Sequence, residues 1–284
     1  MAHKGAAVEE GALIAHNAAA HDAVGARYDV GHPEIFNDVE QARLRAAVER
    51  AVALAGRGRG RVRALDAGCG TGNVTAHLIA AGATVTAADL SQRFLAIVRE
   101  RFAGSGALDG TVALNGRDLA PIPDGAFDLA VTYSVLHHVP DYLRFVRELA
   151  RVAAPGGVVM IDHERAGSYW TSTGMAAFLA EAVVWPQRRW WYWLQPSRYW
   201  KRIRPLLDVR RLRNPRYMPE GDIHIWPDDH IEWRKVEAAL EDAGCTIELR
   251  EQYLLFEPRY RRGVWEHWRT RVADMQLVLA RKAG

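Results

Sequence analysis

A run of alternating glycines, Gly68-Cys69-Gly70-Thr71-Gly72, limits what this chain can fold into more than any other segment. A short apolar stretch with an acid near its end, residues 62–67, comes directly before it. Residues 73–79, whose apolar positions recur at helical spacing, follow it. Glycine permits a tight turn and leaves no side chain between the backbone and a ligand. A strand, a glycine loop and a helix N-terminus in this order therefore predict a site that binds a cofactor by backbone contact.

The spacing within the loop indicates which cofactor it holds. Dinucleotide-binding folds carry the pattern G-x-G-x-x-G, whereas this chain reads D-x-G-x-G-x-G from Asp66 to Gly72. That pattern resembles motif I of the class I S-adenosylmethionine-dependent methyltransferases, and the order of the later signatures is similar to their ubiquinone-biosynthesis branch. The resemblance covers roughly Tyr28 to Asp162. It implies S-adenosyl-L-methionine as the cofactor and methyl transfer as the activity.

Further strands are predicted at regular intervals after the loop. Strands that alternate with helical stretches indicate crossover connections and a parallel sheet. We therefore expect an α/β fold, a Rossmann-like, doubly wound, mostly parallel sheet of seven strands with a helical cap insertion. The strands are expected at 62–67, 83–89, 111–115, 127–132, 158–162 (after a turn at Ala154-Pro155-Gly156-Gly157), 246–255 and 275–280, and a late helix at 231–243 with an acidic N-cap at Asp228-Asp229.

The composition divides the chain into four expected parts: a helical N-terminal lid or lead-in (1–60), the cofactor-binding core (61–162), a cap (163–229), and the last helix and strands of the core (230–284). All ten tryptophans lie at or beyond Trp170, and residues 185–213 carry nine Lys or Arg against one acid. The chain has no run of 18 apolar residues, no apolar signal in its first 20 residues and only two cysteines. We therefore expect a cytoplasmic enzyme.

Three aspartates at strand ends are candidate cofactor ligands. Asp89 lies 17 residues after Gly72, where Rossmann-like folds place the carboxylate that accepts the ribose hydroxyls, and it can also cap the next helix. The resemblance implies that Asp66 orients the amino-acid end of the cofactor. It also implies that Asp118 accepts from the adenine amino group and that the backbone N–H of Leu119 meets the ring. In the alternative interpretation Asp66 only ties down the turn and Asp118 is a solvent-facing loop residue.

The resemblance also places an N-terminal tyrosine–aspartate pair, here Tyr28-Asp29, in a lid over the cofactor, although Tyr28 fits an amphipathic packing face equally well. The chain offers no clear set of carboxylates and histidines at metal-ligand spacing, so we expect no metal. The remaining cofactor contacts are expected from the glycines and from residues at strand ends: Gly68, Gly70, Gly72, Leu90 and Tyr133.

His137 and His138 are the candidate catalytic residues. They follow the fourth strand at the carboxyl end of the sheet, where open α/β folds bind ligands. Transfer to a hydroxyl requires removal of its proton, and the pKa of histidine lies near neutrality. One of the two is expected to be the base, while the other holds the loop. Asp162, at the end of the fifth strand, either orients a histidine or caps the turn that follows.

The Trp- and Arg-rich cap has three interpretations: a structural or substrate lid, a membrane-surface patch, and a nucleic-acid surface. The net charge of only +3 argues against nucleic acid as a partner. The segment Thr132-Tyr133-Ser134-Val135 also lacks the Asn/Asp-Pro-Pro-aromatic signature of enzymes that methylate base amino groups. A membrane patch would make the protein peripheral to the membrane.

The sequence therefore predicts an S-adenosylmethionine-dependent methyltransferase that acts on the oxygen of a small-molecule acceptor (a natural product, a sugar or a lipid-like molecule) with a histidine base. C-methylation of a quinone or isoprenoid acceptor at a membrane surface is a second interpretation. A catalytically inactive scaffold that binds the cofactor is a third, since a fold alone does not establish an activity. The intact glycine loop with Asp89 and Asp118 argues against the third.

Overall fold

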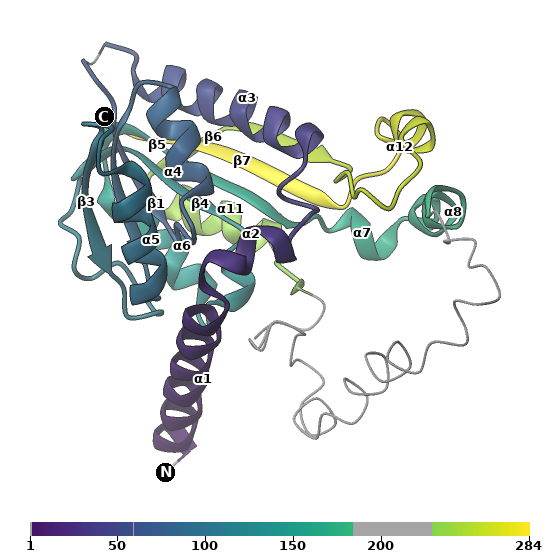
Figure 1. The fold of residues 1–284 in the computed structure, drawn as a ribbon. Coiled ribbons are helices and arrows are strands. Elements are labelled where there is room, and N and C mark those ends of the chain that lie inside the picture. The colour runs from purple at the N-terminus through teal and green to yellow at the C-terminus, as the bar shows by residue number, and fades with distance from the viewer. Residues whose placement is uncertain (1, 59, 184–228) are drawn as a thin grey trace.

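Seven strands form one sheet at the centre of residues 2–58, 60–183 and 229–284, which a computed structural model describes (Figure 1). The order across the sheet is β3-β2-β1-β4-β5-β7-β6, in which β7 is antiparallel to both neighbours and all other neighbours are parallel. This confirms the predicted Rossmann-like sheet. The strands are β1 (Arg63–Ala67), β2 (Thr84–Asp89), β3 (Leu108–Ala113), β4 (Phe127–Tyr133), β5 (Ala153–Arg165), β6 (Cys245–Tyr253) and β7 (Met275–Lys282).

Burial explains which strands the sequence predicted well. β1, β2 and β4 are buried along nearly their whole length, as expected for parallel strands covered on both faces. β3 lies at the sheet edge and is partly exposed, so its apolar pattern is weak, and it begins at Leu108 instead of at 111. β5 is longer than predicted, because Pro155-Gly156-Gly157 lies within the strand where a turn was expected.

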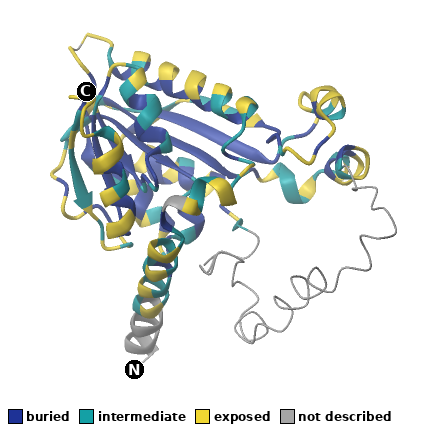
Figure 2. Cartoon of the chain, in the orientation of Figure 1, coloured by how far each residue is buried: buried dark blue, intermediate teal, exposed yellow. Residues whose placement is uncertain are grey.

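Helices cover both faces of the sheet, and Figure 2 shows the strands buried between them. Alternate residues of a strand point to opposite faces. Accordingly Met160 packs in the cluster under α3 and α4, whereas Ile161 packs in the cluster under α6 and α11. The helical elements are α1 (Ala2–Val24), η1 (Gly25–Arg27), α2 (Tyr28–Gly31), α3 (Asp38–Ala55), α4 (Asn73–Ala80), α5 (Gln92–Phe102), η2 (Leu136–His138), α6 (Tyr142–Val152), α7 (Ser168–Thr171), α8 (Thr173–Ala182), α11 (Trp233–Asp242) and α12 (Arg262–Trp268).

The helix predicted at 231–243 starts later than expected. α11 begins at Trp233 with Glu232 as its N-cap, and that side chain makes no capping hydrogen bond. The expected acidic cap is therefore wrong: Asp229 has a φ of 56°, and Asp228 lies outside the described residues. The N–H of Glu232 donates to the hydroxyl of Tyr142 at 3.2 Å and Ile231 is buried, so contacts with the core fix the chain before the helix begins.

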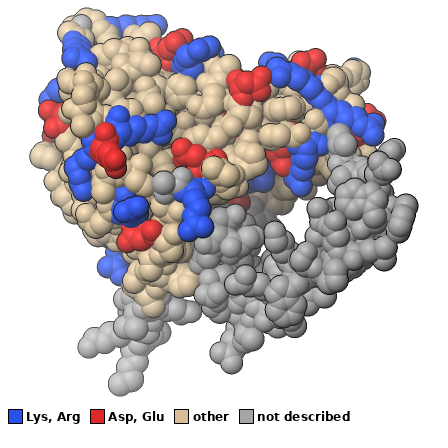
Figure 3. All heavy atoms as spheres, in the orientation of Figure 1, with Lys and Arg blue, Asp and Glu red and all other residues tan. Residues whose placement is uncertain are grey.

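The predicted cap lies mostly outside the described residues, which omit 184–228. Its described part comprises α7 and α8, and α8 packs with α12 around Phe178, Tyr260 and Trp265. On the face seen in Figure 3, basic and acidic side chains of the described residues are intermixed. No helix within the described ranges is long and apolar enough to cross a membrane.

Candidate active site

The glycine loop turns at the carboxyl end of β1 with backbone angles that favour glycine. Gly68, Gly70 and Gly72 have φ values of 84°, 51° and 92°. A Cβ on Gly68 would lie 2.3 Å from Cγ2 of Val135, and a Cβ on Gly72 would lie 2.7 Å from Cε2 of Phe102. A Cβ on Gly70 would meet nothing within 4 Å. The outer glycines thus allow close packing, and the middle one faces open space.

An open cavity of about 1050 Å³, which includes solvent at its mouth, lies between this loop, the ends of β2 and β4, and the N-terminal helices. Concave sites with largely apolar walls and a few convergent polar groups are typical of cofactor and small-ligand binding. The predicted residues that line it are Tyr28, Gly68, Gly70, Asp89, Leu90, Tyr133 and His138. The predicted residues that do not line it are Asp66, Gly72, Asp118, Leu119, His137 and Asp162.

Asp89 ends β2 and joins the glycine loop to α5. One of its oxygens accepts from the N–H of Gly70 at 2.9 Å, and the other accepts from the N–H of Ser91 at 2.8 Å. Burial raises the pKa of Asp89, although these hydrogen bonds oppose the shift. Because a carboxylate has about four acceptor positions, Asp89 can hold this turn and still accept from two hydroxyls on the cavity side.

Asp66 lies behind the loop and is almost completely buried, with 1% of its surface exposed. Its Oδ2 accepts from the hydroxyl of Thr75 on α4 at 2.6 Å. Burial raises the pKa of Asp66 to about 7, the Thr75 hydrogen bond opposes this in part, and the charge of Asp89 adds to it. Two carboxyl groups with little water around them therefore flank the loop, and both favour a positively charged ligand nearby.

Asp118 and Leu119, predicted to contact adenine, are engaged with α6 and their own loop. Asp118 accepts from Nδ2 of Asn115 at 2.7 Å and from Nη2 of Arg144 at 2.5 Å. Burial acts to raise the pKa of Asp118, but the hydrogen bond from Asn115 and the charge of Arg144 bring it below its usual value. The N–H of Leu119, expected to meet the adenine ring, donates to Glu148 at 3.2 Å. The structure therefore does not bring this pair to the cavity.

The N-terminal helices close one side of the cavity. Tyr28 of α2 lines it as predicted, together with residues that the sequence did not single out, Ile14, Asn17 and His21 of α1. The helices are fastened to the core at two points. Asp29 accepts from the hydroxyl of Thr71 in the glycine loop at 2.6 Å, and Asp22 on α1 accepts from the hydroxyl of Ser91.

His138 lines the cavity and His137 lies behind it, with the two ring centres 4.2 Å apart. The Nδ1 of His137 lies 2.9 Å from one oxygen of Glu164. The other oxygen of Glu164 accepts from the backbone N–H groups of Val135 and Leu136 at 2.8 and 2.7 Å. Glu164 is 1% exposed, so this one carboxyl group fixes both the loop after β4 and the ring of His137.

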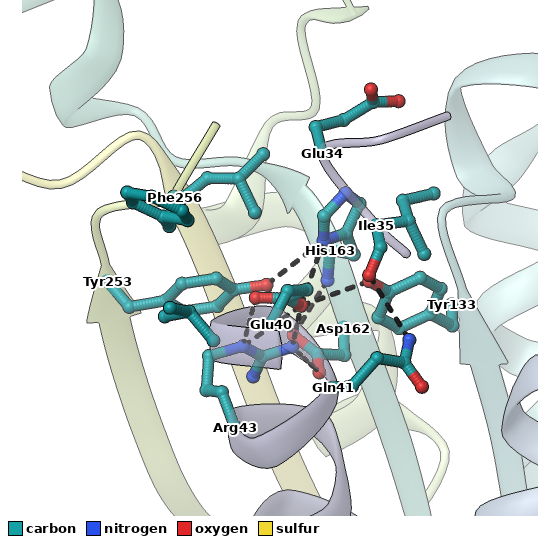
Figure 4. A network of polar contacts seen from close by, with 12 residues as sticks. Glu34, Ile35, Glu40, Gln41, Arg43, Tyr133, Asp162, His163, Tyr253 and Phe256 are labelled. Atoms are coloured by element: carbon teal, nitrogen blue, oxygen red, sulfur yellow. Dashed lines mark hydrogen bonds and ion pairs between the residues drawn. The ribbon is translucent and has the colours of Figure 1, made fainter. Parts of the chain in front are cut away.

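Asp162, predicted either to orient a histidine or to cap the turn that follows, bonds to Arg43, to Tyr253 and to the backbone of His163 (Figure 4). Its Oδ2 accepts from Nη2 of Arg43 at 2.8 Å. Its Oδ1 accepts from the hydroxyl of Tyr253 at 3.0 Å and from the backbone N–H of His163 at 2.7 Å. The carboxyl group that contacts the ring of His137 is instead Glu164, two residues later.

Glu40 of α3 completes this buried group behind Tyr133 (Figure 4). It accepts from Nε of Arg43 at 3.0 and 2.9 Å and from the hydroxyl of Tyr133 at 3.0 Å. Its Oε1 also lies 3.5 Å from Nδ1 of His163. Burial acts to raise the pKa of Glu40, but hydrogen bonds from His163 and Arg43 lower it to about 2. Glu40 is therefore a carboxylate at neutral pH.

Two neighbouring strand ends pass through left-handed backbone. Ser134, after β4, has a φ of 58°, and His163, near the end of β5, has a φ of 63°. Such angles are uncommon outside glycine and gather at functional sites. In a regular strand Asp162 and Glu164 would share a face. The turn at His163, with a register shift between Ile161 and Glu164, gives them different partners.

Three comparisons with known proteins bear on this site. A protein-family model described as a methyltransferase domain matches residues 65–161. A ubiquinone biosynthesis O-methyltransferase of Thiobacillus denitrificans is 31% identical over 150 residues, which cover 52% of this chain and 62% of that protein. The first three curated relatives are matched over only 25%, 62% and 42% of their own lengths.

Two solved structures share the fold. An S-adenosylmethionine-dependent methyltransferase from Mesorhizobium loti is 24% identical, with a TM-score of 0.50 over 84% of this chain and 100% of that one. Magnesium protoporphyrin IX methyltransferase from Synechocystis, with bound S-adenosylhomocysteine, is 17% identical, with a TM-score of 0.50 over 93% of this chain and 97% of that one. Residues 65–161 of this chain match a methyltransferase domain.

The cofactor of the methyltransferase domain is S-adenosylmethionine, and the cavity fits it. The space beside Gly70 admits a ligand against the backbone, and Asp89 has acceptor positions left for a ribose. The Nδ2 of Asn73 on the cavity wall is buried and meets no hydrogen-bond partner among the described residues. A buried donor without a partner is rare, and a carboxylate of the cofactor would satisfy it.

Several residues on or behind the cavity wall could not be singled out from the sequence. The α1 residues on the cavity wall lie in an alanine-rich helix with little amphipathic pattern. Asp162 and Glu164 are acids two residues apart at the end of β5, so the sequence does not distinguish their partners, and Glu40 resembles any charged residue of a surface helix. No group of three or more His, Cys, Asp or Glu side chains in the described ranges could hold a metal, and the expectation of no metal stays a prediction.

Proposed function

We propose that this protein transfers the methyl group of S-adenosylmethionine to an oxygen atom of a small-molecule acceptor. The observation that carries the proposal is the histidine pair at the end of β4, with His138 on the cavity wall and His137 tied to the buried Glu164. The name of the Thiobacillus denitrificans relative, an O-methyltransferase, supports the same chemistry. The apolar and aromatic part of the cavity wall, which includes Tyr28, Phe36 and Phe94, suits a planar or apolar acceptor.

In this proposal His138 is the base and His137 positions it. The cofactor, when bound, supplies an activated methyl group and a good leaving group, so the chain must hold the acceptor and take up its proton. His138 takes the proton because it borders the cavity. His137, held by Glu164, packs against the ring of His138 and limits its rotation.

The test begins with a panel of phenolic, catecholic and sugar hydroxyl acceptors and methyl-labelled cofactor, with products identified by mass. On the acceptor found, His138→Ala should lower turnover by about 10²- to 10⁴-fold, the usual range for loss of a general base. His77→Ala is the control, because His77 bonds to Gln41 away from the cavity wall. If both His137→Ala and His138→Ala keep full turnover, neither histidine is the base that takes up the proton of the acceptor.

C-methylation of a quinone-like or isoprenoid acceptor is the second candidate, and the same panel discriminates it because the mass fragments locate the new methyl group. An inactive scaffold would bind the cofactor and methylate nothing in the panel.

Peripheral membrane contact, and the division into an N-terminal lid, a core and a Trp- and Arg-rich cap, remain our proposals. The tryptophans and arginines that carry the membrane proposal lie at 185–213, outside the described residues. Sedimentation with anionic vesicles at low and high salt tests that contact.

A further inference from the structure

Tyr133 stands between the cavity and a group of buried polar side chains. Tyr133 lines the cavity, its hydroxyl donates to Glu40 at 3.0 Å, and the ring of His163 stacks on its ring with the two centres 4.5 Å apart. The residues behind it form what we call the Glu40 cluster, which joins α3 to the ends of β5 and β6: Glu40, Arg43, Asp162, His163 and Tyr253 (Figure 4).

The Glu40 cluster places the negative charge of Glu40 directly behind Tyr133. Two buried acids, Glu40 and Asp162, face one guanidinium, Arg43. The carboxylates are 2% and 0% exposed, so water screens this charge poorly. Buried ion pairs often stabilise a fold no more than apolar side chains of similar volume would. Packing alone therefore does not account for the cluster.

The strand order directs the sulfur of the cofactor toward Tyr133. Asp89, the proposed ribose ligand, ends β2, and β1 with the glycine loop comes next across the sheet. β4 follows, and at its carboxyl end Tyr133 and His138 line the same cavity. A ligand whose ribose is held at Asp89 and that crosses the glycine loop would reach β4 with its amino-acid end, where Tyr133 and His138 lie.

We propose that Tyr133 and the Glu40 cluster select the charged form of the cofactor, the sulfonium of S-adenosylmethionine, over the thioether of S-adenosylhomocysteine. This inference rests on the proposed function, because it requires that cofactor in the cavity. An aromatic ring attracts a cation, and a phenol that donates to a carboxylate has a more electron-rich ring. Glu40 is a positioning residue, since it acts on the cofactor through Tyr133. The product carries no charge at sulfur, so the same wall favours its release.

Titration calorimetry with S-adenosylmethionine and S-adenosylhomocysteine tests this inference without an acceptor. Glu40→Gln should weaken binding of the sulfonium about tenfold and Tyr133→Phe about threefold, the scale of a partly desolvated cation–π contact. Both variants should bind the thioether within about twofold of the wild type. Tyr260→Phe is the matched control, because its hydroxyl also donates to a carboxylate, that of Glu257 at 2.6 Å, but Tyr260 belongs neither to the cavity wall nor to the Glu40 cluster. Its ratio of the two affinities should equal that of the wild type.

An equal loss of both affinities in Tyr133→Phe, or no loss of either, overturns the inference, because a purely structural role moves both ligands together. A change of the ratio in Tyr260→Phe as large as in Tyr133→Phe overturns it as well. Tyr133→Phe removes one oxygen atom and decides the matter even where Glu40→Gln does not fold. Failure of the proposed function gives a different result, in which the acceptor panel yields no O-methylated product although both ligands bind; a wild type that binds neither ligand overturns the inference, because the cavity then does not hold this cofactor.

Discussion

Asp66→Asn should flatten the dependence of folding stability on pH. The pKa of Asp66 is raised in the folded protein from its ordinary value of 3.8 to about 7, because the group is buried and Asp89 is negatively charged. The folded state therefore holds this proton more tightly than the unfolded state does. The stability that the proton contributes is fully present at acidic pH and is lost as the pH rises through about 7.

The size of the effect follows from the shift. One pKa unit corresponds to about 1.4 kcal/mol, so a shift of about three units removes about 4 kcal/mol between acidic pH and pH 8. About 2–3 kcal/mol of that loss falls between pH 5 and pH 8. Asparagine has nearly the same size and can still accept from Thr75, but it does not titrate.

Urea unfolding of the wild type and Asp66→Asn at pH 5, 6, 7 and 8 measures this difference. The fall in unfolding free energy from pH 5 to pH 8 should be smaller in the variant by about 2–3 kcal/mol. Titrating groups that do not interact with Asp66 are shared by the two proteins and cancel in the comparison. If the fall in unfolding free energy between pH 5 and pH 8 is the same in both proteins within about 0.5 kcal/mol, the assignment of a raised pKa to Asp66 is refuted.

Three further changes test the parts around the cavity. Gly68→Ala should destabilise the fold by about 2 kcal/mol or more in urea unfolding, because its Cβ would meet Val135 at 2.3 Å and its φ is 84°; wild-type stability would contradict the described turn. Asp29→Ala removes the hydrogen bond to Thr71, so limited proteolysis should cut the N-terminal helices faster while the core stays intact; an unchanged cleavage rate would show that this contact does not hold them. Glu164→Gln should lower the unfolding free energy by about 1–3 kcal/mol and turnover about tenfold or more, because one carboxylate contacts His137 and accepts from two backbone N–H groups. Turnover equal to that of the wild type would argue against a positioning role.

The sheet could be predicted because its signal is local. Parallel strands buried on both faces appear as short apolar runs, and the glycine loop marks the end of the first. The prediction was least accurate where burial is partial or unusual. β3 is a half-exposed edge strand, and β5 runs through Pro155-Gly156-Gly157, residues that elsewhere favour turns.

The site was only partly predictable because its contacts join distant residues. Asp89 and the glycines follow from strand, loop and helix in sequence, and the structure places them on or beside the cavity. The link from Arg43 to Asp162 spans 119 residues and leaves no local pattern. The exchange of roles between Asp162 and Glu164 depends on a left-handed turn at His163, an angle that the sequence does not announce at a residue other than glycine.

The most direct test of the central claim, that this cavity binds S-adenosylmethionine through the glycine loop and Asp89, is calorimetric titration of the wild type and Asp89→Ala with S-adenosylhomocysteine, beside NAD. The account predicts one site per chain on the wild type, no heat of binding with NAD, and an affinity for S-adenosylhomocysteine that is weaker in folded Asp89→Ala by about 1.5–3 kcal/mol, the contribution of a hydrogen bond to a charged group. Binding of NAD by the wild type, or equal affinity for S-adenosylhomocysteine in the two proteins, would contradict it.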